Sequence, residues 1–148
     1  MLKGIDPLLN ADILGVLAAM GHGDEIVITD ANFPSESVAH HTVYGTTLRM
    51  DCSAPRAVQA ILSLLPVDDF EPDAVRYMNV VGDPQAVPDV IAEGAALFRA
   101  EGAELTGVDR FDFYDQARQA YAIVQTGERR FYGNFIIRKG VIPPTAGN

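Results

Sequence analysis

Residues 20–34 read MGHGDEIVITDANFP and join the end of an expected helix to the first expected strand. The strand, residues 25–29, is apolar on both faces, which is typical of a sheet covered by helices on both sides. His22 precedes the strand between two glycines, and Asp30 follows it. Because the unperturbed pKa of histidine, about 6.5, permits proton exchange near neutrality, the segment indicates a proton-handling site for a small polar ligand.

Helical and extended patterns alternate on both sides of this segment. We expect helices over residues 10–20, 55–65 and 88–101 and from about Phe111, and strands over residues 25–29, 43–50, 75–81, 105–108, 122–125 and 131–138. This alternation predicts an α/β fold, a single compact layered domain over residues 1–148 with a central, mostly parallel sheet flanked by helices. The last two strands, on either side of residues 126–129, are expected to form a C-terminal strand pair.

Composition narrows the class of protein. The chain has 148 residues, 48% of them apolar, which suits one core of ordinary size. Its net charge of −9 disfavours nucleic acid and anionic membranes as partners. No apolar run approaches the roughly 20 residues of a membrane span. A lone cysteine, Cys52, fits a reducing compartment; we therefore expect a cytoplasmic protein with Cys52 as a small buried apolar residue.

Two patterns could suggest a cofactor. His40 and His41 are adjacent, but neighbouring residues of a strand point to opposite faces, and no carboxylate or cysteine spacing completes a metal site. The glycines around His22 follow a helix and open a strand, whereas a phosphate-binding loop follows a strand and opens a helix. We therefore expect no metal and no nucleotide.

Three motifs occur in a recognisable order: MGHGDEIVITDANFP, then DRFDFYDQA, then AIVQTGERRFYGNFIIRKGV. From LKGIDPLL to KGVI, the chain resembles the family of L-fucose mutarotases and D-ribose pyranases, nearer the fucose branch. The resemblance implies a cofactor-independent isomerase that interconverts the α and β anomers of L-fucose or a related aldose by acid/base-assisted ring opening. It also implies a ring-like homo-oligomer with pockets at subunit interfaces. A non-catalytic sugar-binding or regulatory subunit and a pyranase acting mainly on ribose remain alternatives.

The resemblance also assigns roles to individual residues. His22 would be the catalytic proton donor and acceptor, and the substrate would be bound by Asp30, Arg110, Tyr132, Gly133 and Asn134. The planar guanidinium of Arg110 suits vicinal hydroxyl oxygens. Tyr132 and Asn134 would share one face of the last strand, since they are two positions apart.

The assignments have structural alternatives. Tyr132 and Asn134 could simply belong to one face of an amphipathic strand. His22 could interact with the last carbonyls of the preceding helix. Asp30 could form an Asx turn at the end of the strand. Arg110 could pair with Asp109 or Asp112 in an exposed contact worth at most about 1 kcal/mol.

The spacing between His22 and Asp30 raises a geometric problem. If the interval were fully extended, about 26 Å would separate their backbones, more than a monosaccharide spans. Either the glycines around His22 fold it back beside the strand, or neighbouring subunits complete each pocket. We expect a combination, in which His22, Asp30 and Arg110 come from one subunit and Tyr132 and Asn134 from the next.

Overall fold

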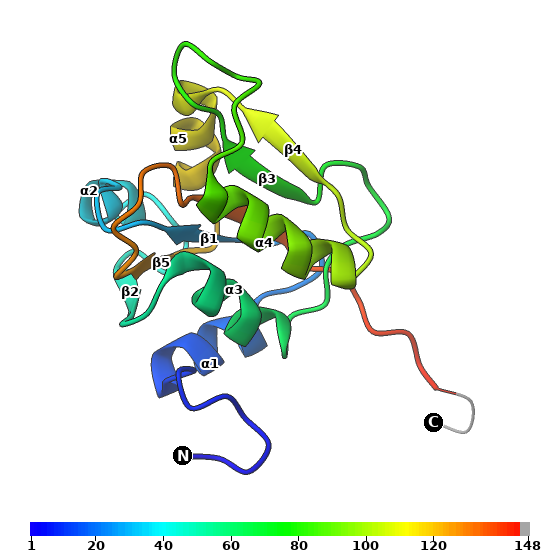
Figure 1. Cartoon of the computed structure of the whole chain (residues 1–148). Helices are drawn as coiled ribbons and strands as arrows, with labels where there is room; N and C mark the ends of the chain where they lie inside the picture. Colours follow the sequence, from blue (N-terminus) through cyan, green and yellow to red (C-terminus); the bar gives the residue numbers. More distant parts are fainter. Residues whose placement is uncertain (146–148) are drawn as a thin grey trace.

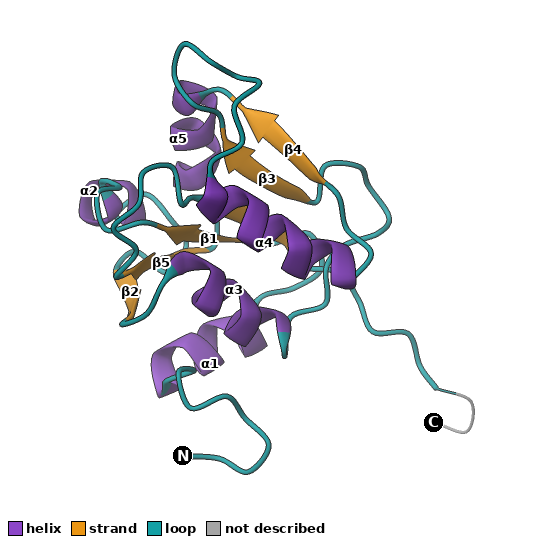
Figure 2. Cartoon of the chain, viewed as in Figure 1, coloured by secondary structure: helices purple, strands orange, loops and turns teal. Residues whose placement is uncertain are grey.

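A six-stranded sheet organises the computed structural model, which describes residues 1–145 (Figures 1 and 2). Its order is β2-β5-β1-β6-β3-β4. The strands are β1 (Glu25–Thr29), β2 (Thr47–Met50), β3 (Val75–Met78), β4 (Leu105–Val108), β5 (Ala122–Thr126) and β6 (Phe135–Arg138). β6 runs antiparallel to both of its neighbours, β1 and β3, whereas the other adjacent strands pair in parallel. The predicted mostly parallel sheet is confirmed.

Helices cover both faces of this sheet. They are α1 (Ala11–Ala19), α2 (Ser35–Ala39), α3 (Ala54–Leu62), α4 (Asp89–Ala100) and α5 (Arg110–Arg118). Ile26 and Ile28 of β1 pack into the core with α1, α3 and α4, whereas Val27 packs into the second core, with α2 and α5. Alternate residues of one strand therefore enter different layers, which explains why β1 is apolar on both faces.

The expected C-terminal strand pair is wrong. β5 and β6 are both neighbours of β1, which lies between them: Ile26 pairs with Ala122 on one side and with Ile137 on the other. A two-stranded hairpin requires a short turn, but residues 127–134 form a longer connection. β1 therefore occupies the centre of the sheet with both of its edges hydrogen-bonded.

Several boundaries also differ from the expected ones. The first helix is confirmed, and the side chain of Asn10 accepts its capping hydrogen bond from the Ile13 amide. β2 and β6 are shorter than expected, because residues 43–46 and 131–134 form turns and irregular segments. His40 and His41 follow the unexpected helix α2 and do not lie in a strand. Cys52 is half-buried against the core, and burial raises the pKa of its thiol.

None of the helices within residues 1–145 has the length and apolar character needed to cross a membrane.

Gly94 allows helix α4 to approach the sheet closely. A Cβ atom at this position would lie 2.5 Å from Cζ of Phe135, a fully buried side chain of β6. A glycine in a helix normally costs about 1 kcal/mol relative to alanine, but here it makes room for an aromatic ring. Gly15 of α1 differs, because a Cβ atom there would meet nothing within 4 Å.

These two glycines give a matched pair of stability variants. Gly94→Ala is expected to lower the free energy of unfolding by about 1–3 kcal/mol, since overpacking outweighs the gain in helix propensity. Gly15→Ala is expected to raise it by about 0.5–1 kcal/mol. Urea unfolding measures both, and a stabilised Gly94→Ala variant would contradict the close packing.

Candidate functional site

The carboxyl ends of the parallel strands meet at one edge of the sheet, and the candidate site lies there. Asp30 follows β1, Met78 ends β3, and Arg110 begins α5 just after β4. Asn134 immediately precedes β6, which starts at the same edge because it is antiparallel. This is the edge at which open α/β sheets bind ligands.

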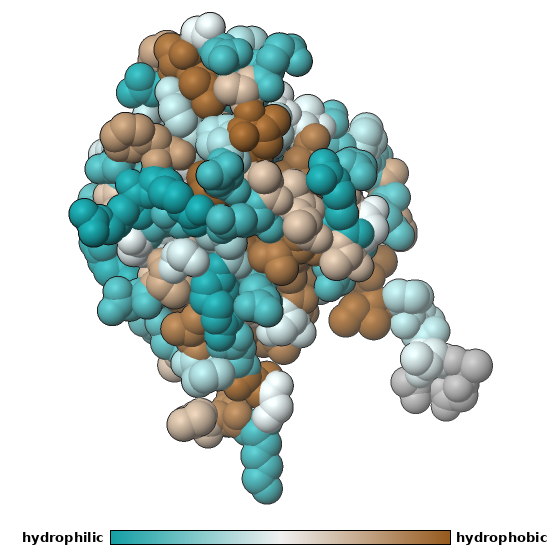
Figure 3. Space-filling view, viewed as in Figure 1, coloured by the Kyte–Doolittle hydropathy of each residue, from teal (hydrophilic) through white to brown (hydrophobic). Residues whose placement is uncertain are grey.

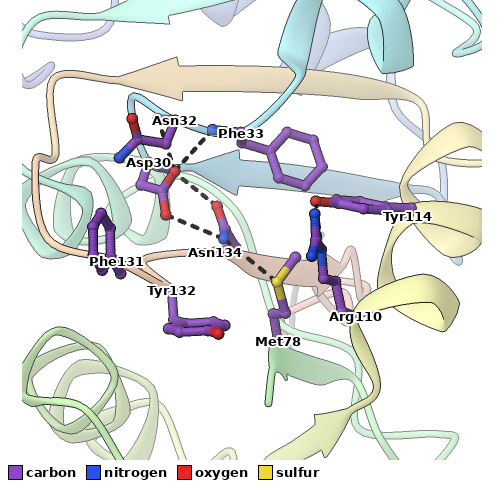
Figure 4. A pocket seen from close by; sticks show the side chains of 9 residues that line it. All are labelled: Asp30, Asn32, Phe33, Met78, Arg110, Tyr114, Phe131, Tyr132 and Asn134. Atoms are coloured by element: carbon purple, nitrogen blue, oxygen red, sulfur yellow. Dashed lines mark hydrogen bonds between the residues drawn. The ribbon is translucent and has the colours of Figure 1, made fainter. Parts of the chain in front are cut away.

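A pocket of about 240 Å³ opens at this edge (Figure 4). It is lined by Asp30, Asn32, Phe33, Met78, Arg110, Tyr114, Phe131, Tyr132 and Asn134. The volume lies just below the roughly 300–1,000 Å³ of typical ligand pockets, which suits a small molecule. The lining combines a carboxylate, amides and a guanidinium with aromatic rings, a combination suited to a ligand that has both hydroxyl groups and an apolar face.

Asp30 is the buried acid of the pocket. Its Oδ1 accepts hydrogen bonds from the backbone amides of Asn32 and Phe33, at 3.0 and 2.9 Å. The Asx turn considered for this residue is thus formed, and the side chain lines the pocket as well. Oδ2 accepts longer bonds from the Gly133 amide, at 3.2 Å, and from Nδ2 of Asn134, at 3.3 Å. Burial raises the pKa of this carboxyl, although the four hydrogen bonds oppose the shift.

Asn134 holds Asp30 in place. Besides its bond to the carboxylate, its Oδ1 accepts a 2.9 Å hydrogen bond from the Asp30 backbone amide. Its Nδ2 also contacts the sulfur of Met78. The side-chain amide of Asn134 therefore serves mainly to orient the acid, and the adjacent Gly133 contributes a backbone amide to the same carboxylate.

Arg110 and Tyr114 lie one helical turn apart on α5. Nε of Arg110 donates a 3.0 Å hydrogen bond to the Tyr114 hydroxyl, a contact that raises the pKa of the guanidinium. None of the ion pairs within residues 1–145 involves Arg110, so the alternative pairing with Asp109 or Asp112 is not formed. Among the hydrogen bonds within residues 1–145, Arg110 uses Nε alone, so its two terminal nitrogens remain available to a ligand.

Tyr132 lines the pocket from a turn, not from a strand. Its φ is 66°, a left-handed conformation that is uncommon for a bulky residue and typical of strained functional positions. Its hydroxyl accepts a 3.2 Å hydrogen bond from the Val81 amide. The expectation that Tyr132 and Asn134 share a strand face is therefore wrong, yet both side chains border the pocket.

His22 lies at the opposite edge of the sheet, before β1. Its Nε2 is 3.0 Å from Oδ1 of Asp68, and its ring packs edge-on against Phe70. The imidazole is 40% exposed, while the carboxylate of Asp68 is 1% exposed. The carbonyls at the end of α1 are bonded by Lys139, not by His22. An exposed imidazole oriented by a buried carboxylate has the arrangement of a general base.

The expected grouping of site residues must be corrected. Asp30, Arg110, Tyr132 and Asn134 of one chain line the same pocket, and His22 is not among its lining residues. The glycine turn before β1 does not fold His22 back towards Asp30, because the Gly23 amide donates to the carbonyl of Lys139 at the far edge.

Several residues of the two regions were not anticipated from the sequence. Tyr114 could have been found, since it lies four residues after Arg110 on a helix. Phe131 opens the stretch FYGN, residues 131–134 of the third motif, and Met78 lies within the strand expected over residues 75–81. Asp68, by contrast, lies 46 residues from His22, and no local pattern connects them.

Comparisons with known proteins find relatives over nearly the whole chain. Residues 3–142 match the model of the RbsD / FucU transport protein family. A fucose mutarotase from Danio rerio is 41% identical, over 97% of this chain and 96% of its own. The crystal structure of a putative sugar binding protein, Atu2016, is 50% identical with a TM-score of 0.93, covering 97% of each chain. That of the fucose mutarotase from Streptococcus pneumoniae, in complex with L-fucose, is 37% identical with a TM-score of 0.86, covering 96% of this chain and 100% of that one.

Removal of the charge on Asp68 provides a pH test of its pairing with His22. The hydrogen bond with His22 lowers the pKa of Asp68 below its usual 3.8. The ionised carboxylate therefore stabilises the fold fully above its usual pKa, and this contribution declines below it and is lost as the pH falls through the lower pKa of the folded state. Asp68→Asn should therefore cost about 1 kcal/mol of unfolding free energy at pH 7, and less at pH 3. Urea unfolding at both pH values measures this, with Asp69→Asn as the exposed control. A cost that is unchanged at pH 3 would contradict the pairing.

Proposed function

The chain belongs to the RbsD / FucU family, and from this premise we propose that it is a fucose mutarotase, an isomerase that interconverts the α and β anomers of L-fucose. The support comes from two sides. Relatives named fucose mutarotase are 41% and 38% identical over nearly the whole chain. The observation that carries the proposal is the pocket at the carboxyl edge of the sheet, where a buried acid and an arginine face aromatic rings.

The reaction needs two proton transfers. A base removes the proton from the anomeric hydroxyl, the bond between the anomeric carbon and the ring oxygen breaks, and an acid protonates the ring oxygen. The aldehyde group of the open sugar then rotates, and the hydroxyl formed from the ring oxygen adds to its other face. This step returns each proton to the group that supplied it. Anomeric exchange already proceeds in water, so positioned acid and base groups supply enough acceleration.

Within this proposal, His22 handles the protons. Its Nε2 is held by Asp68, so Nδ1 is the nitrogen left for proton exchange. A carboxylate that accepts a hydrogen bond from one ring nitrogen fixes the tautomer and leaves the lone pair on the other. Asp68 thus acts as a positioning residue for the imidazole.

Asp30, Arg110 and Tyr132 hold the sugar in the same proposal. Of the two oxygens of Asp30, Oδ2 has the longer contacts and is the one that a sugar hydroxyl can approach. The terminal nitrogens of Arg110 suit a pair of hydroxyl oxygens. The hydroxyl of Tyr132 accepts a bond from Val81 and retains its own proton for donation. Gly133 and Asn134 support the site through Asp30.

We further propose that His22 enters the pocket of a neighbouring subunit. β1 alone, with five residues, spans roughly 15 Å between its two ends, so one chain does not bring its own imidazole to its own pocket. Apolar side chains are exposed at both edges: Phe111 and Phe131 beside the pocket, and Phe70 against the His22 ring. Figure 3 shows apolar groups where the C-terminal segment leaves the body of the protein. Contact between unlike edges would bury both sets and generate a ring.

The remaining alternatives differ in chemistry or in substrate. A non-catalytic sugar-binding subunit would need the pocket but not an oriented imidazole, and the His22–Asp68 pair favours the enzyme. Ribose is less favoured than L-fucose, because the relatives at 37–41% identity carry the name of fucose mutarotase. A cytoplasmic location remains a prediction from the sequence.

Saturation-transfer NMR on the anomeric protons of L-fucose tests the activity. We expect the protein to accelerate exchange between the two anomers, and His22→Ala to reduce kcat at least 100-fold, since general acid/base catalysis contributes about 10²–10⁴-fold. His41→Ala, which removes an exposed imidazole elsewhere, is the control and should retain full activity. Exchange unaffected by the wild-type protein would refute the assignment, and tight sugar binding without exchange would identify a binding subunit.

Mixed oligomers test the shared pocket. His22→Ala and Tyr132→Phe subunits are each expected to be impaired, but co-refolded hybrids should regain activity, because some pockets combine an intact His22 with an intact Tyr132. Native mass spectrometry confirms that hybrids have formed. Confirmed hybrids that remain as inactive as their parents would place His22 and Tyr132 in a pocket made by one chain.

A further inference from the structure

A third buried carboxylate, Glu128, takes no part in the chemistry described above. The residue is 4% exposed and is not among the pocket-lining residues. It lies in the connection between β5 and β6, which also carries Tyr132 and Gly133. A buried carboxylate is costly unless it is well paired, so its partners indicate what it does.

The carboxylate of Glu128 is bonded from two directions. Oε1 accepts hydrogen bonds from the backbone amide of Arg130, at 3.0 Å, and from its Nε, at 2.9 Å. Oε2 accepts from a terminal nitrogen of Arg130, at 3.0 Å, and from the amide of Ala54, the first residue of α3, at 3.2 Å. These contacts lower the pKa of Glu128 to about 2, so the group is ionised throughout the working range. The Glu128 anion therefore links residues 128–130 to the N-terminus of α3 by hydrogen bonds.

The same residue contacts both halves of the pocket. Its backbone carbonyl accepts a 2.8 Å hydrogen bond from the Ala31 amide, directly after Asp30. Its Cγ lies only 3.0 Å from where a Cβ atom of Gly133 would be, so Gly133 packs directly on the Glu128 side chain. Gly133 in turn donates its amide to Asp30. The strained turn at Tyr132 lies between these fixed points.

We infer that Glu128 is a positioning residue for the sugar site, whose carboxylate holds residues 130–134 in the ligand-ready conformation before any sugar arrives. The inference rests on the proposed function for the identity of the ligand, but the preorganised turn itself does not depend on it. A left-handed tyrosine persists only when its surroundings fix it. Without the Glu128 anion, the turn relaxes, Tyr132 leaves the position that faces the ligand, and the Gly133 amide moves away from Asp30.

An outer ion pair offers a matched control. Arg130 also bonds Glu93 of α4, at 2.7 and 3.0 Å, but the Glu93 side chain is 51% exposed. Exposed pairs contribute little. Removing the charge of Glu93 leaves every bond of Glu128 intact, so it changes the charge near Arg130 without releasing the turn.

The test compares Glu128→Gln with Glu93→Gln. In the isosteric Glu128→Gln variant, the new NH₂ group faces N–H donors, so the turn loses part of its support. The KM for L-fucose should rise at least tenfold while kcat changes less than threefold, because the turn binds the sugar and His22 handles the protons. Glu93→Gln should keep both constants within twofold of the wild type. A folded Glu128→Gln variant with an unchanged KM would overturn the inference. A fall in kcat as large as the rise in KM would overturn it as well.

Hydrogen–deuterium exchange of the sugar-free protein gives a second readout that needs no activity. Amides of residues 130–134 should exchange at least tenfold faster in Glu128→Gln than in the wild type or Glu93→Gln, with β1 unchanged. Equal rates would overturn the inference even if the protein proves to have no mutarotase activity. If Glu128→Gln fails to fold, Arg130→Met replaces it. We expect the same rise in KM and the same faster exchange of residues 130–134. Wild-type values in both assays would refute the positioning role of Glu128.

Discussion

The carboxylate of Asp30 at the end of β1 is the constraint on which the pocket depends. Its four hydrogen bonds join two separate segments of the chain: the turn after β1, and the consecutive residues Gly133 and Asn134. Because the group is buried, each of these donors is needed to offset the cost of placing a charge out of water. The segment before β6 and the end of β1 are therefore fixed relative to one another, and Arg110 and Tyr132 are arranged around them.

The central position of β1 also determines how far His22 lies from the pocket at Asp30. The strand is hydrogen-bonded to a neighbour on each side and covered by helices on both faces, so it is held straight through the core. Its two ends therefore lie on opposite sides of the sheet. One end carries Asp30 and the other carries His22 with Asp68. A chain built in this way keeps His22 away from its own pocket at Asp30. Under the proposed function, association of unlike edges brings the two together and makes catalysis depend on assembly.

The sequence predicted local features well and long-range contacts poorly. Asn10 and the apolar spacing after it predicted α1, and the motifs identified Asp30, Arg110 and Tyr132, all of which border one pocket. The C-terminal pair was misjudged because adjacency along the chain does not reveal that β1 inserts between β5 and β6. The hydrogen bonds of Asp68 with His22 and of Glu128 with α3 join segments that are distant in the sequence. No periodicity or spacing predicts such contacts.

The most direct measurement is a crystal structure of the assembled protein with bound L-fucose. The account predicts that the sugar lies between Asp30 and Arg110 of one subunit, with the His22 imidazole of the adjacent subunit about 2.6–3.2 Å from the anomeric or ring oxygen. A sugar bound in this pocket with no imidazole from any subunit near either oxygen would contradict it.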